Sequence, residues 1–140
     1  MDFSIHHLHG FNHGAILVSA LILWFLGAAW YSPALFAKPW IAALGIVPGG
    51  PKKGLAKGMI ASLIGDLLVA FALLHMILWS EASTFAAGAF IGFLAWLGFF
   101  AATQLPQGIY EGRPLKLFYI NSGYWLVGLL IVGGLEAVWQ

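Results

Sequence analysis

Four long apolar runs dominate the pattern of residues along the chain, at about 14–31, 58–79, 85–105 and 117–138. Each run approaches the ~20 residues that a helix rising ~1.5 Å per residue needs to cross a ~30 Å hydrocarbon core. Helices are expected because a segment in lipid must pair its own backbone polar groups, and the strict alternation of a barrel strand is absent. The pattern predicts an all-α fold, a left-handed, up-down integral membrane four-helix bundle, as one domain over residues 1–140.

The longest connection, residues 32–56, contains a further segment. Its first part, residues 34–44, is short, aromatic and apolar with one lysine, which is typical of a helix lying in the headgroup layer. We therefore expect an interfacial segment after the first helix. The other two connections, at about 80–84 and 107–114, are short enough to be turns.

The cationic residues predict an orientation. The chain has 6 Lys and Arg residues, and all of them lie in two loops: Lys38, Lys52, Lys53 and Lys57 in one, Arg113 and Lys116 in the other. A four-span chain places these two loops on the same side of the membrane. The positive-inside rule then predicts that both loops are cytoplasmic and that both termini are outside.

Composition supports a membrane location. The chain is 61% apolar and 8% charged, whereas a soluble domain is about a quarter charged, so we expect the lipid bilayer to cover the surface. A net charge of +1 gives no reason to expect nucleic acid as a partner. The absence of cysteine excludes disulfides and cysteine nucleophiles. Asp2 and histidines, not basic residues, precede the first run, which argues against a cleaved signal peptide.

Two blocks of residues carry a resemblance to a known family. The first comprises Trp30-Tyr31-Ser32-Pro33, Leu35-Phe36, Lys38 and Trp40. The second comprises Glu111-Gly112-Arg113, Leu115-Lys116-Leu117, Ile120-Asn121 and Gly123-Tyr124. Together they resemble the signatures of a bacterial membrane family called domain of unknown function 1761, over nearly the whole chain. The resemblance implies a four-helix membrane fold and no activity. Together with the orientation predicted from the cationic residues, it predicts a bacterial inner (plasma) membrane location with both termini on the periplasmic side. The histidine-rich start and Asp66 depart from the family pattern.

Asp66 is the most informative polar residue, because it lies about nine residues, or ~13 Å, from Lys57 and so near mid-bilayer. An acid there costs on the order of 3 kcal/mol and should face protein or water. The candidate hydrogen-bond donors to it are Gln104, Asn121 and Tyr124. Two interpretations stay open. Asp66 is either a proton- or ion-responsive carboxylate on a transport path with these residues, or part of an inter-helix hydrogen bond that fixes packing.

The histidines form a second candidate site. They are His6, His7, His9 and His13 before the first run and His75 near the end of the second. Two or three imidazoles could bind Zn²⁺ or Cu²⁺, with Glu81 or Glu136 as a further ligand. The spacing matches no closed structural site, and short histidine tracts at termini are often simply solvated, so metal binding ranks third among the expected functions.

Gly88 and Gly92 form a GxxxG pattern in the third run. Small residues at this spacing allow close approach of a second helix, which predicts either a homodimer seam or an internal helix contact. The pattern does not decide between them.

Two functions of different classes are expected from these features. The leading expectation is a small oligomeric transporter or channel-like protein that uses Asp66, and the alternative is a non-catalytic accessory or structural subunit of a larger membrane assembly. A transporter predicts a continuous polar cavity that reaches Asp66, whereas an accessory subunit predicts a dry bundle. No catalytic constellation and no nucleotide, haem or flavin motif is present, so we expect neither an enzyme nor an organic cofactor.

Overall fold

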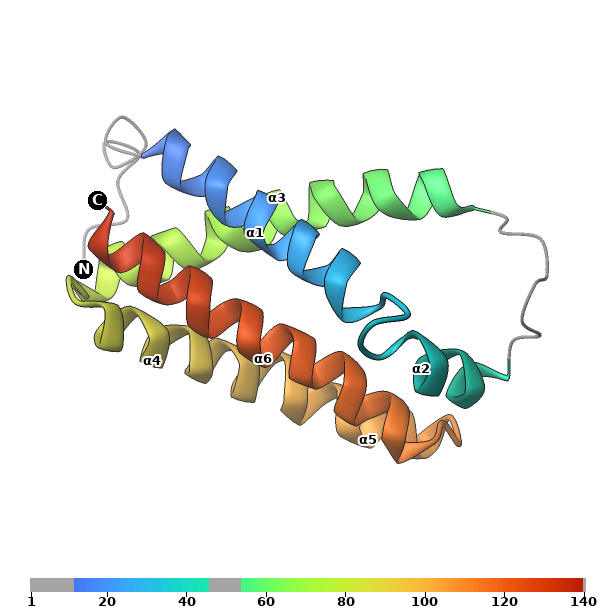
Figure 1. Ribbon diagram of the computed structural model, residues 1–140. Coiled ribbons are helices and arrows are strands. Elements are labelled where there is room, and N and C mark those ends of the chain that lie inside the picture. Colours follow the sequence, from blue (N-terminus) through green and yellow to red (C-terminus); the bar gives the residue numbers. More distant parts are fainter. Residues whose placement is uncertain (1–11, 46–53, 140) are drawn as a thin grey trace.

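The computed structural model describes residues 12–45 and 54–139, and within these ranges every regular element is a helix. In chain order the elements are α1 (His13–Trp30), α2 (Ala37–Leu44), α3 (Leu55–Ser80), α4 (Phe85–Ala95), the π-helical segment η2 (Trp96–Ala101), α5 (Ala102–Tyr110) and α6 (Leu115–Val138). Four helices are long and apolar enough to cross a membrane, and α4, η2 and α5 together make one of them (Figure 1). The expectation of four long apolar helices is confirmed.

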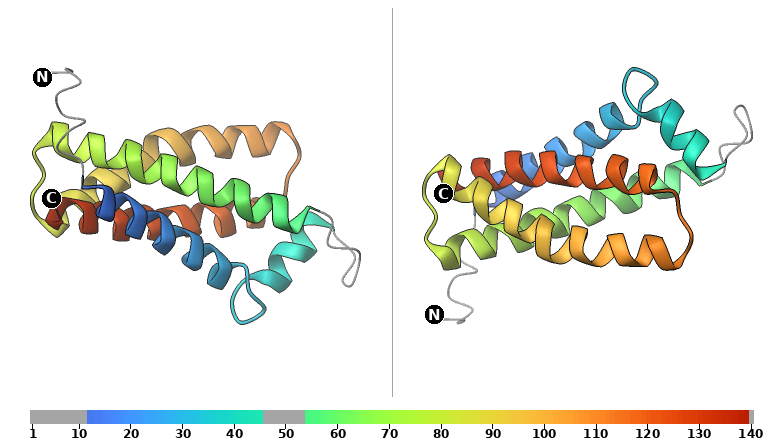
Figure 2. Two further views of the ribbon diagram at one scale, coloured as in Figure 1. Left: turned by 90° about the horizontal axis from the view of Figure 1, so that it is seen from above. Right: turned by 90° about the horizontal axis from the view of Figure 1, so that it is seen from below.

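Successive long helices run in opposite directions (Figures 1 and 2). The start of α1, the turn between α3 and α4, and the end of α6 lie together at one end of the molecule, which we call the terminal end. We call the opposite end, with α2 and the turn between α5 and α6, the loop end. The described cationic residues all lie at the loop end: Lys38, Lys57, Arg113 and Lys116.

Side-chain caps and special backbone positions set the helix ends. The Asn12 side chain accepts a hydrogen bond from the Ala15 N–H (3.1 Å) at the start of α1, and Thr84 does the same for α4. Each cap satisfies a backbone donor that the first turn of a helix leaves unpaired. The turn after α3 is closed by Glu81, which has a positive φ of 59°. The short α2 falls within the segment expected to be interfacial.

The third membrane helix is not a uniform α-helix, because six of its residues form the π-helical segment η2. The Thr103 hydroxyl is placed to donate to the carbonyl oxygens of Phe99 (2.9 Å) and Phe100 (3.1 Å), two groups in the irregular turn. A π-segment shifts the register between the residues before and after it. The apolar pattern predicted one continuous helix and gave no sign of this change.

α4 and α6 make the most extensive contact between helices. Gly88 and Gly92 of α4 lie against the backbone of α6, at Gly133 and Leu129 respectively. A methyl group on either α4 glycine would collide with a carbonyl oxygen of α6. Glycine is therefore required here, since the two backbones are in direct contact.

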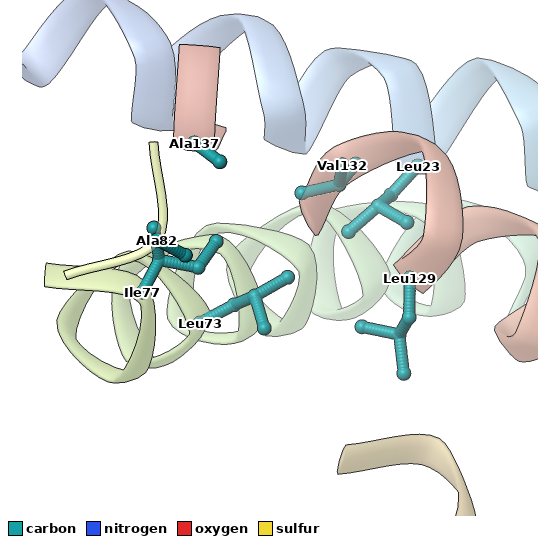
Figure 3. Packing of buried hydrophobic residues seen from close by; sticks show 7 residues of the cluster. All are labelled: Leu23, Leu73, Ile77, Ala82, Leu129, Val132 and Ala137. Carbon is teal, nitrogen blue, oxygen red and sulfur yellow. The ribbon is translucent and has the colours of Figure 1, made fainter. Parts of the chain in front are cut away.

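The apolar core lies toward the terminal end, where α1, α3 and α6 meet (Figure 3). Its buried members are Leu23, Leu73, Ile77, Ala82, Leu129, Val132 and Ala137. Much of the remaining apolar surface faces outward, and Phe99, for example, is 75% exposed. Such a surface suits contact with lipid, because a soluble monomer rarely exposes large contiguous apolar patches.

Tryptophan side chains tie the helices together through polar contacts. Three indole N–H groups donate to backbone carbonyl oxygens of a neighbouring helix: Trp24 to Met59 (3.1 Å), Trp30 to Ile120 (2.9 Å) and Trp96 to Ser122 (2.9 Å). In an apolar environment an indole N–H group without a partner costs free energy. Each of these hydrogen bonds avoids that cost and also fixes the position of one helix relative to the other.

Candidate functional site

Asp66 is held in the interior by the middle of α3. Its side chain is only 3% exposed, on the face of α3 that also buries Ala70, Leu73 and Ile77. No described residue donates a hydrogen bond to its carboxyl group, and no described cation pairs with it. A carboxyl group in this setting has lost most of its contact with water, at a cost in free energy. Asp66 is therefore a largely buried acid without a hydrogen bond or an ion pair among the described residues.

Tyr124 of α6 is the polar neighbour of Asp66, close enough for the two groups to interact electrostatically. This agrees with the sequence, since both residues lie about nine positions from a loop lysine. The Tyr124 hydroxyl does not donate to Asp66, however, because it donates to the Leu23 carbonyl oxygen at 2.7 Å. Gly27 gives it room: a methyl group there would lie 3.3 Å from the hydroxyl oxygen. The hydrogen bond expected between Tyr124 and Asp66 is therefore absent, although the two side chains are close enough to interact electrostatically.

Asn121 lies one helical turn closer to the loop end than Tyr124. Its side-chain oxygen accepts a hydrogen bond from the Tyr31 hydroxyl at 2.6 Å. Tyr31 immediately follows α1, and its ring also contacts the Tyr124 ring, with centroids 5.9 Å apart. Asp66, Tyr124, Tyr31 and Asn121 therefore form a string of polar side chains inside the molecule.

A small cavity at the loop end continues this string. It has a volume of about 50 Å³ and lies between α5 and α6, with Gln104, Arg113 and Asn121 among its polar lining residues. A water needs roughly 10–15 Å³ of such space, so a few water molecules fit. The structure thus brings Asn121 and Gln104 to one cavity and Asp66 and Tyr124 to one neighbourhood. Asp66 does not line the cavity, and Gln104 is exposed on α5, away from Asp66.

A larger, apolar groove lies between α3, η2 and α6, with a volume of about 360 Å³. Its lining includes Val69, Leu73, Phe99 and Trp125, and Phe100 lines both this groove and the loop-end cavity. The groove exists because α3 packs on α1, α6 and α4 and diverges from α5 toward the loop end (Figure 2). It offers space for an apolar chain and no polar route to Asp66.

A second buried acid, Glu136, lies near the end of α6. It is 0% exposed, and neither carboxyl oxygen has a hydrogen-bond partner among the described residues. The Ser19 hydroxyl of α1 is equally buried and lies next to the carboxyl group, although the pair falls outside strict hydrogen-bond geometry. The sequence placed Glu136 at the outer membrane surface as a candidate metal ligand. Its position inside the last apolar run was the available signal that it is buried.

The histidine constellation is described only in part. His6, His7 and His9 lie outside the described residues. His13 is the first residue of α1, and His75 binds the Phe71 carbonyl oxygen through Nδ1 (2.8 Å) while its ring contacts Phe71 and Trp79. No group of three or more His, Asp or Glu side chains able to hold a metal is found in the described part of the chain.

The GxxxG glycines serve an internal contact. Gly88 and Gly92 are buried against α6 of the same chain, so they are not free to form a homodimer seam. The physical reason is that α6 presents its own glycine, Gly133, at the matching position. Of the two alternatives that the pattern left open, the structure supports the internal one.

Comparison with known proteins identifies the family of the chain but indicates no activity. No curated protein and no solved structure matches the chain. The model of one family does match, over residues 14–135, and its description is protein of unknown function, DUF1761. This range includes all four helices that are long and apolar enough to cross a membrane, except the last residues of α6 and the first of α1. The chain belongs to the DUF1761 family, as the two sequence blocks around Trp30 and Glu111 indicated.

Proposed function

We propose that this chain is a small membrane transport protein in which Asp66 binds a proton or a small cation on a polar path from the loop end. The observation that carries the proposal is the Asp66 carboxyl group, buried without a hydrogen bond and without a cation beside Tyr124. An acid inside a membrane domain is costly, and a group kept at that cost usually has a role on an ion or substrate pathway.

The polar groups between Asp66 and the loop end support this role. Tyr124 and Asn121 are three residues apart and so lie on one face of α6. Asn121 also borders the cavity that Gln104 and Arg113 line, which has room for water. A small movement of α3, which diverges from α5 at this end, would join the cavity to Asp66.

We further propose a bacterial inner membrane location with the loop end in the cytoplasm and both termini on the periplasmic side. The loop end carries every described Lys and Arg residue, which the positive-inside rule places on the cytoplasmic side. The transport path would then open toward the cytoplasm in the conformation observed.

Flux through reconstituted protein tests the role of Asp66. Purified wild type, Asp66→Asn and a control variant, Ser62→Ala, are placed in liposomes, and internal pH is followed after an imposed pH gradient. Ser62 lies one turn away on α3, is exposed and bonds only to its own helix, at the Met59 carbonyl oxygen (2.9 Å). We expect flux in wild type and Ser62→Ala and its loss in Asp66→Asn. Unchanged flux in a folded Asp66→Asn protein would remove Asp66 from the mechanism.

The second candidate function is a non-catalytic accessory subunit of a membrane assembly, and the apolar groove is the observation that favours it. A groove of about 360 Å³ lined by Val69, Ala72 and Phe99 would bury the side chains of a partner helix. A photocrosslinking residue in place of Ala72 tests this in native membranes. Crosslinks to one defined protein support it, and crosslinks to lipid alone contradict it.

We also propose that the chain self-associates through a surface other than Gly88 and Gly92. The loop-end half of α3 exposes small residues. Gly58 and Ser62 face outward, and nothing lies within 4 Å of a methyl group built on Gly58. A second copy could approach closely there. Counting photobleaching steps of labelled protein in liposomes measures the oligomeric state, and a Gly58→Leu variant should lower it.

A further inference from the structure

We propose that Glu136 and Ser19 form a proton-binding site at the terminal end of the molecule, separate from Asp66 and closed toward the solution by Trp139. The proposed site goes beyond the proposed transport function. Glu136 is a second acid, it lies outside the path from the loop end to Asp66, and the ion that it binds is a proton. The evidence for it is that Glu136 of α6 and Ser19 of α1 are buried and that their side-chain oxygens lack hydrogen-bond partners among the described residues.

The first step is the chemistry of the buried pair. Glu136 is 0% exposed with both carboxyl oxygens unpartnered among the described residues, and the Ser19 hydroxyl beside it is also unpartnered. The Ser19 hydroxyl is the one donor at hand among the described residues, and a buried carboxylate that a single hydroxyl solvates is costly. One added proton removes the charge, and the neutral carboxyl group and the hydroxyl can then each donate and accept a hydrogen bond.

The surroundings argue for a proton over a metal ion. In the described part of the chain, Glu136 belongs to no group of three or more His, Asp or Glu side chains. The set of ligands that a divalent cation needs is therefore missing. Neither of the two cavities described above includes Glu136 or Ser19. A proton needs no such space.

The ionisable groups on the neighbouring elements do not reach Glu136. On α1 the nearest described one is His13, which is exposed at the helix start, and α4 carries none. On α3 the nearest one along the helix is His75, placed against the Phe71 carbonyl oxygen, whereas Asp66 and Lys57 lie farther toward the loop end, and Glu81 follows α3 on the surface. Among the described residues, no hydrogen bond or ion pair links any of these groups to Glu136.

Trp139 closes the site at the end of α6. It lies three residues beyond Glu136, so the two side chains share one face of the chain as it leaves the helix. Asn12 Nδ2 donates to the Trp139 carbonyl oxygen (3.1 Å), and the Trp139 ring lies 3.5 Å from the position of a methyl group on Gly14. These contacts join the start of α1 to the end of α6 about one turn beyond the acid, and in the proposed site they close this seam toward the solution.

The two acids lie on opposite sides of the apolar core. Tyr124, beside Asp66, and Glu136 are 12 positions apart in α6, which corresponds to ~18 Å along a helix. Leu23, Leu73 and Val132 fill the space between these levels (Figure 3). No chain of polar side chains crosses this core in the described structure, so Glu136 exchanges its proton toward the terminal end.

Carbodiimide labelling tests the site without measuring transport. Dicyclohexylcarbodiimide, an apolar reagent, adds to a protonated carboxyl group in a membrane and rearranges to a stable N-acylurea that peptide mass spectrometry locates. We expect it to modify Glu136 in folded protein in liposomes, equally in wild type and in Asp66→Asn. We expect a water-soluble carbodiimide to modify the exposed Glu81 and to leave Glu136 unmodified. Trp139→Ala and, separately, Asn12→Ala should make Glu136 reactive to the soluble reagent.

Infrared spectroscopy gives a second, independent readout. We expect the carbonyl band of a protonated carboxylic acid in Asp66→Asn, where Asp66 cannot contribute to it, and its loss when Glu136→Gln, a change of nearly the same shape, is added. Absence of that loss, failure of the apolar reagent to modify Glu136, or equal reactivity of Glu136 and Glu81 toward the soluble reagent in wild type would each overturn the proposal. Since no readout involves flux, these results are separable from the outcome with Asp66→Asn.

Discussion

Gly88 of α4 lies directly against Gly133 of α6, backbone to backbone. A methyl group on Gly88 would collide with the Gly133 carbonyl oxygen and also approach the Ala137 side chain (2.5 Å). The helices therefore pack at a distance that only glycine permits, and the largest helix contact in the molecule depends on it.

Gly88→Ala is expected to destabilise the protein because α4 must move away from α6. The cost of overpacking is about 1–3 kcal/mol in the free energy of unfolding. Unfolding in mixed detergent and sodium dodecyl sulfate micelles, followed by far-UV circular dichroism, measures it. Gly98→Ala is the matched control, since nothing lies within 4 Å of a methyl group there and Gly98 belongs to the same membrane helix. Equal stability of the two variants would contradict the packing argument.

Tyr124→Phe is expected to lower the free energy of unfolding by about 1 kcal/mol, because it removes a buried hydrogen bond to the Leu23 carbonyl oxygen. We also expect slower flux, because Tyr124 is the polar neighbour of Asp66. The same unfolding and liposome assays apply. Tyr119→Phe serves as control, since Tyr119 is on the same helix and 65% exposed. If Tyr124→Phe were less stable yet transported at the wild-type rate, Tyr124 would have only a structural role.

The proposed orientation predicts which turns are accessible from outside the cell. The chain contains no cysteine, so single cysteines report cleanly. Ser83→Cys, in the exposed turn between α3 and α4, should react with a membrane-impermeant maleimide on intact cells. Glu111→Cys, in the turn between α5 and α6, should react only after the membrane is opened. The reverse pattern would place the loop end outside.

Metal binding through the histidine-rich start is expected to need His13 together with the residues that precede it, because the described histidines form no cluster of their own. Calorimetry with Zn²⁺ and Cu²⁺ on protein without a purification tag measures it, with His13→Ala and His75→Ala as separate variants. A dissociation constant weaker than about 1 mM for both metals would end this proposal.

The sequence predicted part of the site for a definite reason. Counting nine residues from Lys57 and from Lys116 reaches Asp66 and Trp125, the neighbour of Tyr124 in the chain, so Asp66 and Tyr124 were expected at about one depth, which follows from the fixed rise of a helix. It did not predict that Tyr124 would donate to Leu23, since that contact depends on how α1 faces α6. Nor did it place Gln104, because the π-helical segment η2 changes the register of the residues that follow it.

Glu136 shows a second limit of sequence reasoning. An acid two residues from the end of a membrane helix is ordinarily solvated, so its position suggested a surface ligand. Its burial depends on residues distant in the sequence, and the Ser19 side chain of α1 is the one that lies beside the carboxyl group. Similarly, the same GxxxG spacing fits an internal or an external partner, and only the position of Gly133 decided between them.

By itself the sequence determined the number and approximate position of the apolar helices, because the thickness of a bilayer and the cost of unpaired backbone groups in lipid act on each run independently. The tertiary structure alone decided which polar groups meet and which remain unpartnered. That outcome depends on helix rotation and close approach, which are set by contacts between residues such as Gly88 and Gly133 that lie far apart in the chain.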